Sequence, residues 1–170
     1  MSASPLGRGL WVALLVLPLI HTAGGASEEQ KADAVLVVKS EKRLYLLDEG
    51  EAFASYHVTF GEDPKGHKER RGDGRTPEGR YVLDYKNSQS SYYRSIHVSY
   101  PNEQDRRVAR KLGADPGGDI MIHGQPNGWG WAGFALQTIS WTDGCIALTD
   151  SDMDHVWQAV DPGTPIEIRP

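Results

Sequence analysis

The 170-residue sequence contains a single cysteine, no excess of basic charge and no apolar run of the length that a membrane span requires. Because Cys145 stands alone, no disulfide can form within the chain. The chain has 18 Lys and Arg residues against 23 Asp and Glu residues, a balance that indicates neither nucleic acid nor an anionic membrane as a partner. Four histidines show no metal-ligand spacing with one another or with Cys145, so we predict no metal site; they are His57, His67, His97 and His155.

The N-terminus has the three parts of a secretory signal peptide. Arg8 supplies positive charge, residues 9–20 form an apolar stretch of about a dozen residues, and small residues follow over 22–26. The apolar stretch is short for a membrane anchor, and Pro18 weakens it further. We therefore predict a signal peptide over residues 1–26, a short linker over 27–33, and one exported, soluble domain over 34–170 without a stable membrane anchor.

Many short β-rich runs and few helical patterns predict a mostly β fold, either a β-sandwich or an open barrel, with two short helices. The expected strands are residues 34–39, 43–47, 53–60, 80–85, 95–100, 119–122, 145–148 and 165–168. Asn102 is a plausible N-cap for one helix over 103–112, and Thr149 or Ser151 for a second helix that contains Met153 and Val156. The loop over 61–74 is long enough to favour a functional role, and its basic residues over 65–75 are expected on a solvated surface.

The unpaired Cys145 calls for an explanation in an exported chain, because thiols oxidise outside the cytosol. It is either a small buried hydrophobe or a nucleophile, and a nucleophilic thiol needs a base to take its proton. His123 is the best candidate base, since it follows a buried strand 22 residues before Cys145, and adjacent antiparallel strands would bring the two residues together. The alternative for His123 is a structural, hydrogen-bonded histidine without a chemical role.

Attack of a thiolate on a carbonyl also requires stabilisation of the resulting oxyanion. The backbone N–H groups of Asp143 and Gly144, with that of Cys145, are consecutive donors, and glycine permits the turn that would point them together. The alternative is an ordinary turn before a strand.

These motifs resemble the catalytic domain of the YkuD-like L,D-transpeptidases. Residues 120–124 read Ile-Met-Ile-His-Gly, and residues 140–147 read Ser-Trp-Thr-Asp-Gly-Cys-Ile-Ala. The family motif pairs a His-Gly or His-Ser with a later Ser/Thr-His-Gly-Cys and a hydrophobic residue. Similar segments lie over 72–79, 100–102 and 116–120, so the resemblance covers residues 34–169, and Trp-Thr-Asp-Gly-Cys marks a branch of the family.

The resemblance implies an exported, periplasmic enzyme that acts on peptidoglycan stem peptides and needs neither metal nor cofactor. Cys145 would attack the carbonyl at the L-centre of meso-diaminopimelate and release the terminal D-alanine of a tetrapeptide. His123 would be the general base, the Gly124 carbonyl would orient its ring, and Asp143 and Gly144 would supply oxyanion N–H groups.

Three functions remain open on the sequence alone. They are transfer of the acyl group to an amine, hydrolysis of stem peptides or protein attachments by the same fold, and peptidoglycan binding without turnover. The acceptor could be another stem, the side chain of a wall-attached lipoprotein, a free D-amino acid or water. The family's usual histidine two residues before the cysteine is Asp143 here, which leaves the choice of acceptor open.

Four further residues are candidate substrate contacts: Arg75, Trp129, Trp131 and Thr142. Arg75 could grip a substrate carboxylate, although a surface salt bridge is the alternative. Glycines alternate with aromatic residues over 127–134, which is typical of a flap whose rings stack on sugar or cover the stem peptide. Packing of Trp129 and Trp131 into the core is the alternative.

Overall fold

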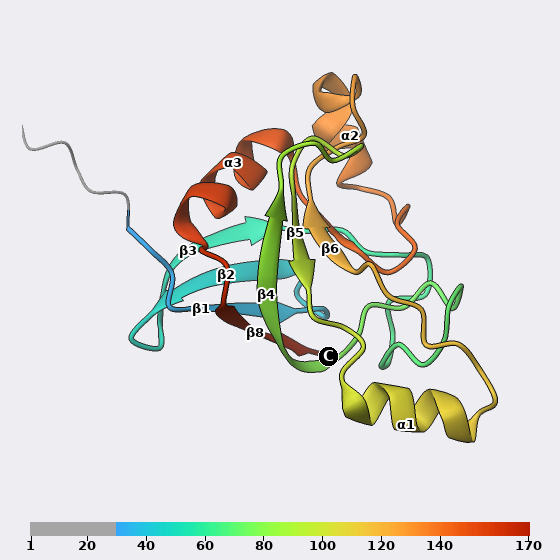
Figure 1. Ribbon diagram of the computed structural model, residues 1–170. Helices are drawn as coiled ribbons and strands as arrows, with labels where there is room; N and C mark the ends of the chain where they lie inside the picture. Colours follow the sequence, from blue (N-terminus) through green and yellow to red (C-terminus); the bar gives the residue numbers. More distant parts are fainter. Residues whose placement is uncertain (1–29) are drawn as a thin grey trace, which may run out of the picture.

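The computed structural model describes residues 30–170, so the predicted signal peptide and its cleavage site lie outside the described residues. Within 30–170, no helix combines the length and apolar character that a membrane crossing requires. Figure 1 shows a sheet with helices at its periphery.

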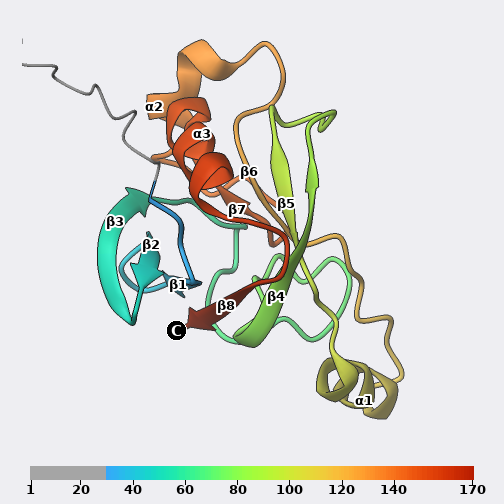
Figure 2. The ribbon, with the colours of Figure 1, turned by 60° about the vertical axis from the view of Figure 1, so that its left-hand side comes forward.

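A single eight-stranded sheet forms the framework, with strand order β3-β2-β1-β8-β4-β5-β6-β7. The sheet is strongly curved, so that β1–β3 lie at a large angle to β4–β6 (Figures 1 and 2). The mostly β class predicted from the sequence is therefore confirmed. The strands are β1 (Ala34–Val38), β2 (Arg43–Asp48), β3 (Glu51–His57), β4 (Gly79–Asn87), β5 (Ser95–Val98), β6 (Met121–His123), β7 (Ile146–Ala147) and β8 (Thr164–Arg169).

Both predicted helices are present, and a third short one occupies the glycine- and aromatic-rich segment. The helices are α1 (Glu103–Lys111), α2 (Gly133–Leu136), which a 3₁₀ turn η1 (Gly130–Ala132) precedes, and α3 (Asp150–Ala159). Asn102 caps α1 by accepting from the amides of Gln104 and Asp105. Thr149 caps α3 by accepting from the Asp152 amide. The cap residues thus set the first turn of each longer helix, because they satisfy amides that the helix itself leaves unbonded.

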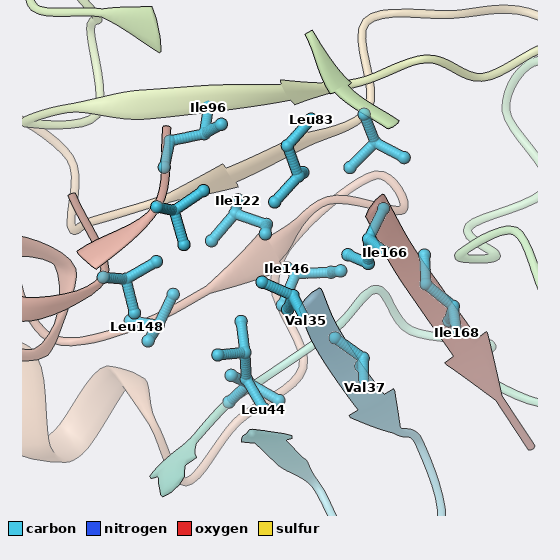
Figure 3. Close-up of a cluster of buried hydrophobic side chains, with 14 of the residues drawn as sticks. Val35, Val37, Leu44, Leu83, Ile96, Ile122, Ile146, Leu148, Ile166 and Ile168 are labelled. Carbon is cyan, nitrogen blue, oxygen red and sulfur yellow. The ribbon is translucent and has the colours of Figure 1, made fainter. Parts of the chain in front are cut away.

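The hydrophobic core lies on one face of the sheet, and α3 contributes Met153, Val156 and Ala159 to it. In β1, β2 and β8 the residues alternate between buried and more exposed positions, as expected for strands with one face in the core. Figure 3 shows the aliphatic side chains that meet there, among them Val35, Leu44, Ile122, Ile146 and Ile166. The strands β5, β6 and β7 differ, since they are buried or half-buried on both faces, and their second face belongs to the candidate site.

The loop between β3 and β4 carries a buried ionic network. Lys68 is only 3% exposed, and its Nζ lies 2.8 Å from Asp73 Oδ1. Asp73 also accepts from the backbone amides of Glu69, Arg70 and Arg75. Burial alone would raise the pKa of Asp73, but these hydrogen bonds outweigh it and lower the pKa to about 2. The expectation that this basic segment is simply solvated is therefore wrong for Lys68, because Asp73 lies within reach and compensates its burial.

Replacement of Asp73 with Asn is expected to destabilise the protein by about 3 kcal/mol, because it leaves the Lys68 ammonium buried without its counter-charge. Urea denaturation of the two proteins measures the difference. The matched control is Asp115→Asn, which breaks the exposed Arg71–Asp115 pair and should leave the midpoint nearly unchanged. The contribution of Asp73 should persist above the ordinary carboxyl pKa and disappear as the pH falls toward about 2. Equal losses in the two variants would contradict this account.

Candidate active site

The pairing of β6 with β7 brings His123 and Cys145 onto one face of the sheet. The two strands are parallel, with Ile122 opposite Ile146 and His123 opposite Ala147. Ile122 and Ile146 point into the core, and side chains alternate along a strand, so His123 and Cys145 point to the opposite face. The prediction that neighbouring strands unite the two residues is correct, but the antiparallel orientation was wrong. A parallel pair requires a crossover connection, and the segment with η1 and α2 supplies it.

Cys145 lies just before β7 with its thiol held between two backbone groups. The Met121 amide donates to Sγ at 3.4 Å, and Sγ lies 3.6 Å from the Asp119 carbonyl oxygen, to which the thiol can donate. Burial raises the pKa of the Cys145 thiol, Asp143 and Asp119 add to that rise, and the Met121 amide and the Lys68 charge act against it. The thiol is half-buried in a pocket and does not pack into the core, and its raised pKa favours the protonated form.

His123 is 4% exposed and has one of its two ring nitrogens fixed. Nδ1 lies 2.7 Å from the carbonyl oxygen of Gly124, so Nδ1 must carry the proton and the neutral ring presents an unprotonated Nε2. Burial lowers the pKa of His123 to about 4, although the Gly124 hydrogen bond acts in the other direction. The imidazole is therefore neutral at physiological pH and able to accept a proton.

Aromatic rings and a glycine fix the position of His123. The ring of Tyr92 lies 4.8 Å from the imidazole, and that of Trp141 lies 5.5 Å away at a steep angle. A side chain at position 124 would collide with Asp150 and Tyr93, so only glycine fits there. Asp150, the first residue of α3, also accepts from the Gln125 amide at 2.8 Å. The backbone that orients the imidazole is thus tied to the start of α3.

The turn before Cys145 is buttressed by the loop between β3 and β4. Gly144 has φ +111°, and a Cβ there would collide with the backbone carbonyl of Arg75. Gly61 forms an isolated parallel bridge with Thr142, which joins the other end of the loop to the same turn. Thr142 Oγ1 donates to the Cys145 carbonyl at 2.8 Å and accepts from the Gly144 amide at 3.3 Å. Thr142 therefore holds the turn internally, and the loop holds it from outside.

His123 and Cys145 line the same pocket, of about 360 Å³. Ser90, Ser91 and Tyr92 from the β4–β5 hairpin form one wall, and Trp141, Thr142 and Asp143 form another. Asp119 and Asp143 contribute negative charge, whereas Lys and Arg are absent from the lining. Trp141 Nε1 is buried and has no hydrogen-bond partner among residues 30–170. The pocket thus combines a thiol, a neutral imidazole, hydroxyl groups and two carboxylates.

The other candidate residues lie outside this cluster or have partners of their own. Arg75 pairs with Asp63 at 3.2 Å, as the salt-bridge alternative anticipated, while its carbonyl packs against Gly144. Trp129 and Trp131 are 54% and 84% exposed, so their packing into the core is excluded. In the part of the chain that the structure describes, no three His, Cys, Asp or Glu residues are grouped as metal ligands.

Several site residues escaped the sequence analysis. Tyr92 and Asp150 carry no motif signal, because their roles depend on a hairpin and a helix start that come near His123 only in three dimensions. Asp119 adopts φ +55° and places its carbonyl oxygen within reach of the thiol. In the sequence, only the turn residues before it indicated an unusual backbone at this position.

Comparison with known proteins matches this architecture to one family. The model of the L,D-transpeptidase catalytic domain (YkuD) matches residues 32–168. The chain is 30% identical over 135 residues to YafK of Escherichia coli K12, which is provisionally named as an L,D-transpeptidase. That match covers 78% of this chain and 44% of YafK, so the chain spans less than half the length of the curated relatives it matches.

Solved structures share the fold. The helical cell shape determining protein Pgp2 from Campylobacter jejuni superposes with a TM-score of 0.58 at 26% identity, over 79% of this chain and 46% of Pgp2. Bd1075 of Bdellovibrio bacteriovorus gives 0.56 at 22% identity, over 82% of this chain and 51% of Bd1075, and supports the fold alone. With its mostly β fold and a family match that covers most of its length, the chain belongs to the L,D-transpeptidase catalytic domain family.

Proposed function

We propose that this protein is a peptidoglycan L,D-transpeptidase that uses Cys145 as its nucleophile and His123 as its general base. The observation that carries the proposal is the placement of both side chains on one sheet face and in one pocket. The Nδ1–H of His123 is committed to the Gly124 carbonyl, which leaves Nε2 as the proton acceptor.

The proposed reaction starts from a neutral pair. His123 Nε2 takes the proton of Cys145 as Sγ forms a bond to the carbonyl carbon at the L-centre of meso-diaminopimelate. The tetrahedral intermediate collapses, the bond to the terminal D-alanine breaks, and the imidazolium returns the proton to the leaving amine. An amine, which loses a proton to His123, then attacks the thioester, and Cys145 is released as the thiol. A preformed thiolate is not needed, in agreement with the raised pKa of the thiol and the lowered pKa of the imidazole.

The turn over 143–145 is the proposed oxyanion site. The amides of Asp143, Gly144 and Cys145 are consecutive, and the positive φ of Gly144 bends the chain between them. The Gly144 amide donates to Thr142 Oγ1 at 3.3 Å in the resting turn, so it must exchange that partner to serve the intermediate. Thr142 therefore has a positioning role in this proposal.

The polarity of the pocket fits a stem peptide that contains diaminopimelate. The side-chain ammonium of diaminopimelate suits a lining with Asp119 and Asp143 and without Lys or Arg. We infer that the amine of a second stem is the acceptor and that the enzyme acts in the cell envelope. A role in cell shape, as named for Pgp2, is a consistent extension.

Hydrolysis is the second candidate, and Asp143 is the observation that favours it. Asp143 is exposed at the position where the family usually carries a histidine, immediately beside the nucleophile turn. A carboxylate there can accept a hydrogen bond from a water molecule and hold it beside the thioester that the nucleophile turn presents.

Incubation with disaccharide-tetrapeptides should yield a cross-linked dimer that has lost one D-alanine, which mass spectrometry detects. Cys145→Ala should reduce product formation about a thousandfold or more, because no other group on this face can form the thioester. Tripeptide without dimer would identify water as the acceptor and establish the hydrolase. Product formation that survives in Cys145→Ala would contradict both candidates.

The acid limb of kcat/KM should have its midpoint near pH 4, because His123 acts in the neutral form and burial lowers its pKa to about 4. Activity is therefore retained through the range where an ordinary imidazole becomes protonated, and is lost as the pH falls below about 4. Circular dichroism over the same range serves as the control for acid unfolding. A midpoint near the ordinary imidazole value of about 6.5 would refute the neutral, buried base.

Gly144→Ala should lower kcat about tenfold to a thousandfold, because the added Cβ meets the Arg75 carbonyl and turns the oxyanion amides away. The control is Gly163→Ala, since Gly163 also has a positive φ, of +99°, but open space around its Cβ position. Steady-state kinetics and thermal melting of both variants separate the two effects. If both variants lose stability equally and neither loses kcat, the turn has no part in catalysis.

A further inference from the structure

The crossover between His123 and Cys145 exposes a set of aromatic rings that the proposed reaction does not use. Trp131 is 84% exposed, Phe134 is 87% exposed, and Trp129 is 54% exposed. The rings of Trp129 and Trp131 stack 6.1 Å apart with an interplanar angle of 18°. In Figure 1, α2 stands at the top of the molecule, beyond the end of the sheet. We call residues 127–139 the aromatic crest.

The backbone of the crest is fixed although its rings face solvent. The Asn127 amide donates to the Ser91 carbonyl at 3.0 Å, and Asn127 Oδ1 accepts from the Tyr93 amide at 2.8 Å. These bonds join the crest to the hairpin that forms a wall of the catalytic pocket. At Gly130 a Cβ would collide with the Asp150 carboxylate, so the backbone there packs closely on the start of α3. Exposed rings on so well-fixed a backbone mark a binding surface.

A second hollow, of about 440 Å³, lies beside Phe134 and shares no lining residue with the catalytic pocket. In Figure 2, α2 and α3 lie next to each other above β3, and the hollow lies between these elements. Its lining combines one aromatic ring with hydrogen-bonding side chains: Lys42, His57, Phe134, Gln137, Thr138, Thr149 and Asp152.

The polar groups of the hollow are arranged to meet a ligand that both donates and accepts. Lys42 and Asp152 both line the hollow, and within residues 30–170 neither forms a salt bridge that would occupy its charge. His57 Nδ1 lies 3.3 Å from Gln137 Oε1, and Gln137 Nε2 donates to the Ala147 carbonyl at 3.3 Å. Gln137 thereby joins the hollow to β7, the strand that follows the nucleophile.

We propose that the aromatic crest and this hollow bind the glycan strand to which the stem peptide is attached, a chain of N-acetylated amino sugars. The apolar C–H face of a sugar packs on an exposed aromatic ring, and its hydroxyl and acetamido groups need the mixture of donors and acceptors found here. An anionic membrane would instead require a cluster of basic residues beside the rings. Residues 127–139 contain no charged residue, and the hollow adds only Lys42, which Asp152 offsets.

The crest connects the two sites within one segment of chain. It starts four residues after His123 and ends six residues before Cys145, and Asn127 ties it to the hairpin of the catalytic pocket. A glycan strand on the crest would therefore present its stem peptides close to the thiol. We name an N-acetylated amino sugar as the ligand because the proposed substrate is peptidoglycan, so the identity of the sugar rests on the proposed function. Binding of the glycan itself requires no catalysis.

The test uses the full chain with Cys145→Ala and soluble, peptide-free oligomers of β-1,4-linked N-acetylglucosamine, titrated by calorimetry. Saturable binding is expected, and Trp131→Ala and Phe134→Ala should each weaken it about fivefold to tenfold through the loss of a stacking ring. Asp152→Asn should weaken it as well. Leu112→Ala, which removes an exposed apolar side chain next to α1, is the matched control and should change the affinity less than about twofold.

Absence of binding to the oligomers, or equal losses in Leu112→Ala and the crest variants, would overturn the proposal. Binding to phosphatidylglycerol vesicles in place of the oligomers would assign the crest to a membrane, and a crest-dependent dimer in sedimentation would assign it to a second copy. Because the oligomers carry no peptide, glycan binding without any muropeptide product would sustain this inference while the proposed reaction fails. Product formation without glycan binding would support the proposed reaction and overturn the glycan inference.

Discussion

The register between β6 and β7 is the constraint on which the candidate site depends. One step along a strand turns a side chain from one face of the sheet to the other, so the pairing of Ile122 with Ile146 decides where His123 and Cys145 point. Both isoleucines are fully buried in the core. A slip by one residue would expose them and carry the thiol and the imidazole inside. The hydrophobic effect that stabilises the fold therefore also fixes the geometry of the chemical groups.

Burial sets the protonation state of this pair. In water the ordinary pKa of a thiol lies about two pH units above that of an imidazole, so the neutral pair already predominates. Burial here widens that difference, because it raises the pKa of Cys145 and lowers that of His123. A raised pKa disfavours the thiolate, which is the form of the thiol that oxidants attack. The buried Lys68 acts in the opposite direction, and Asp73 holds it in place. The loop between β3 and β4 therefore supports the site in two ways. Lys68 acts on the charge of the thiol, and Arg75 and Gly61 pack against the turn before Cys145.

Local patterns allowed much of this structure to be predicted. Alternating apolar residues located the strands, and Asn102 and Thr149 marked the starts of α1 and α3, because side-chain caps act within a single turn. Such patterns could not predict the strand orientation at the site. The strand β6 has three residues and β7 has two, which is too short for a sequence pattern to separate parallel from antiparallel pairing. The burial of Lys68 could not be predicted from the local sequence either, because it depends on the ion pair with Asp73 that forms only in the fold. The contact between Tyr92 and His123 could not be predicted either, because only the folded β4–β5 hairpin brings the two rings together.

The parallel pairing has a further consequence for the shape of the molecule. A two-residue turn cannot join parallel strands, so the chain between His123 and Cys145 must leave the sheet and return to it. That excursion could have been covered with polar residues, as most connections are. Here it carries stacked tryptophans and Phe134 in water, on a backbone that Asn127 and Asp150 hold against the β4–β5 hairpin and α3. The most exposed of these rings, those of Trp131 and Phe134, add little to the free energy of folding, because they remain largely in water. Its presence on the crossover is therefore best explained by a ligand that stacks on the rings, and the sugar strand of the proposed substrate carries the groups that the crest and its hollow can bind.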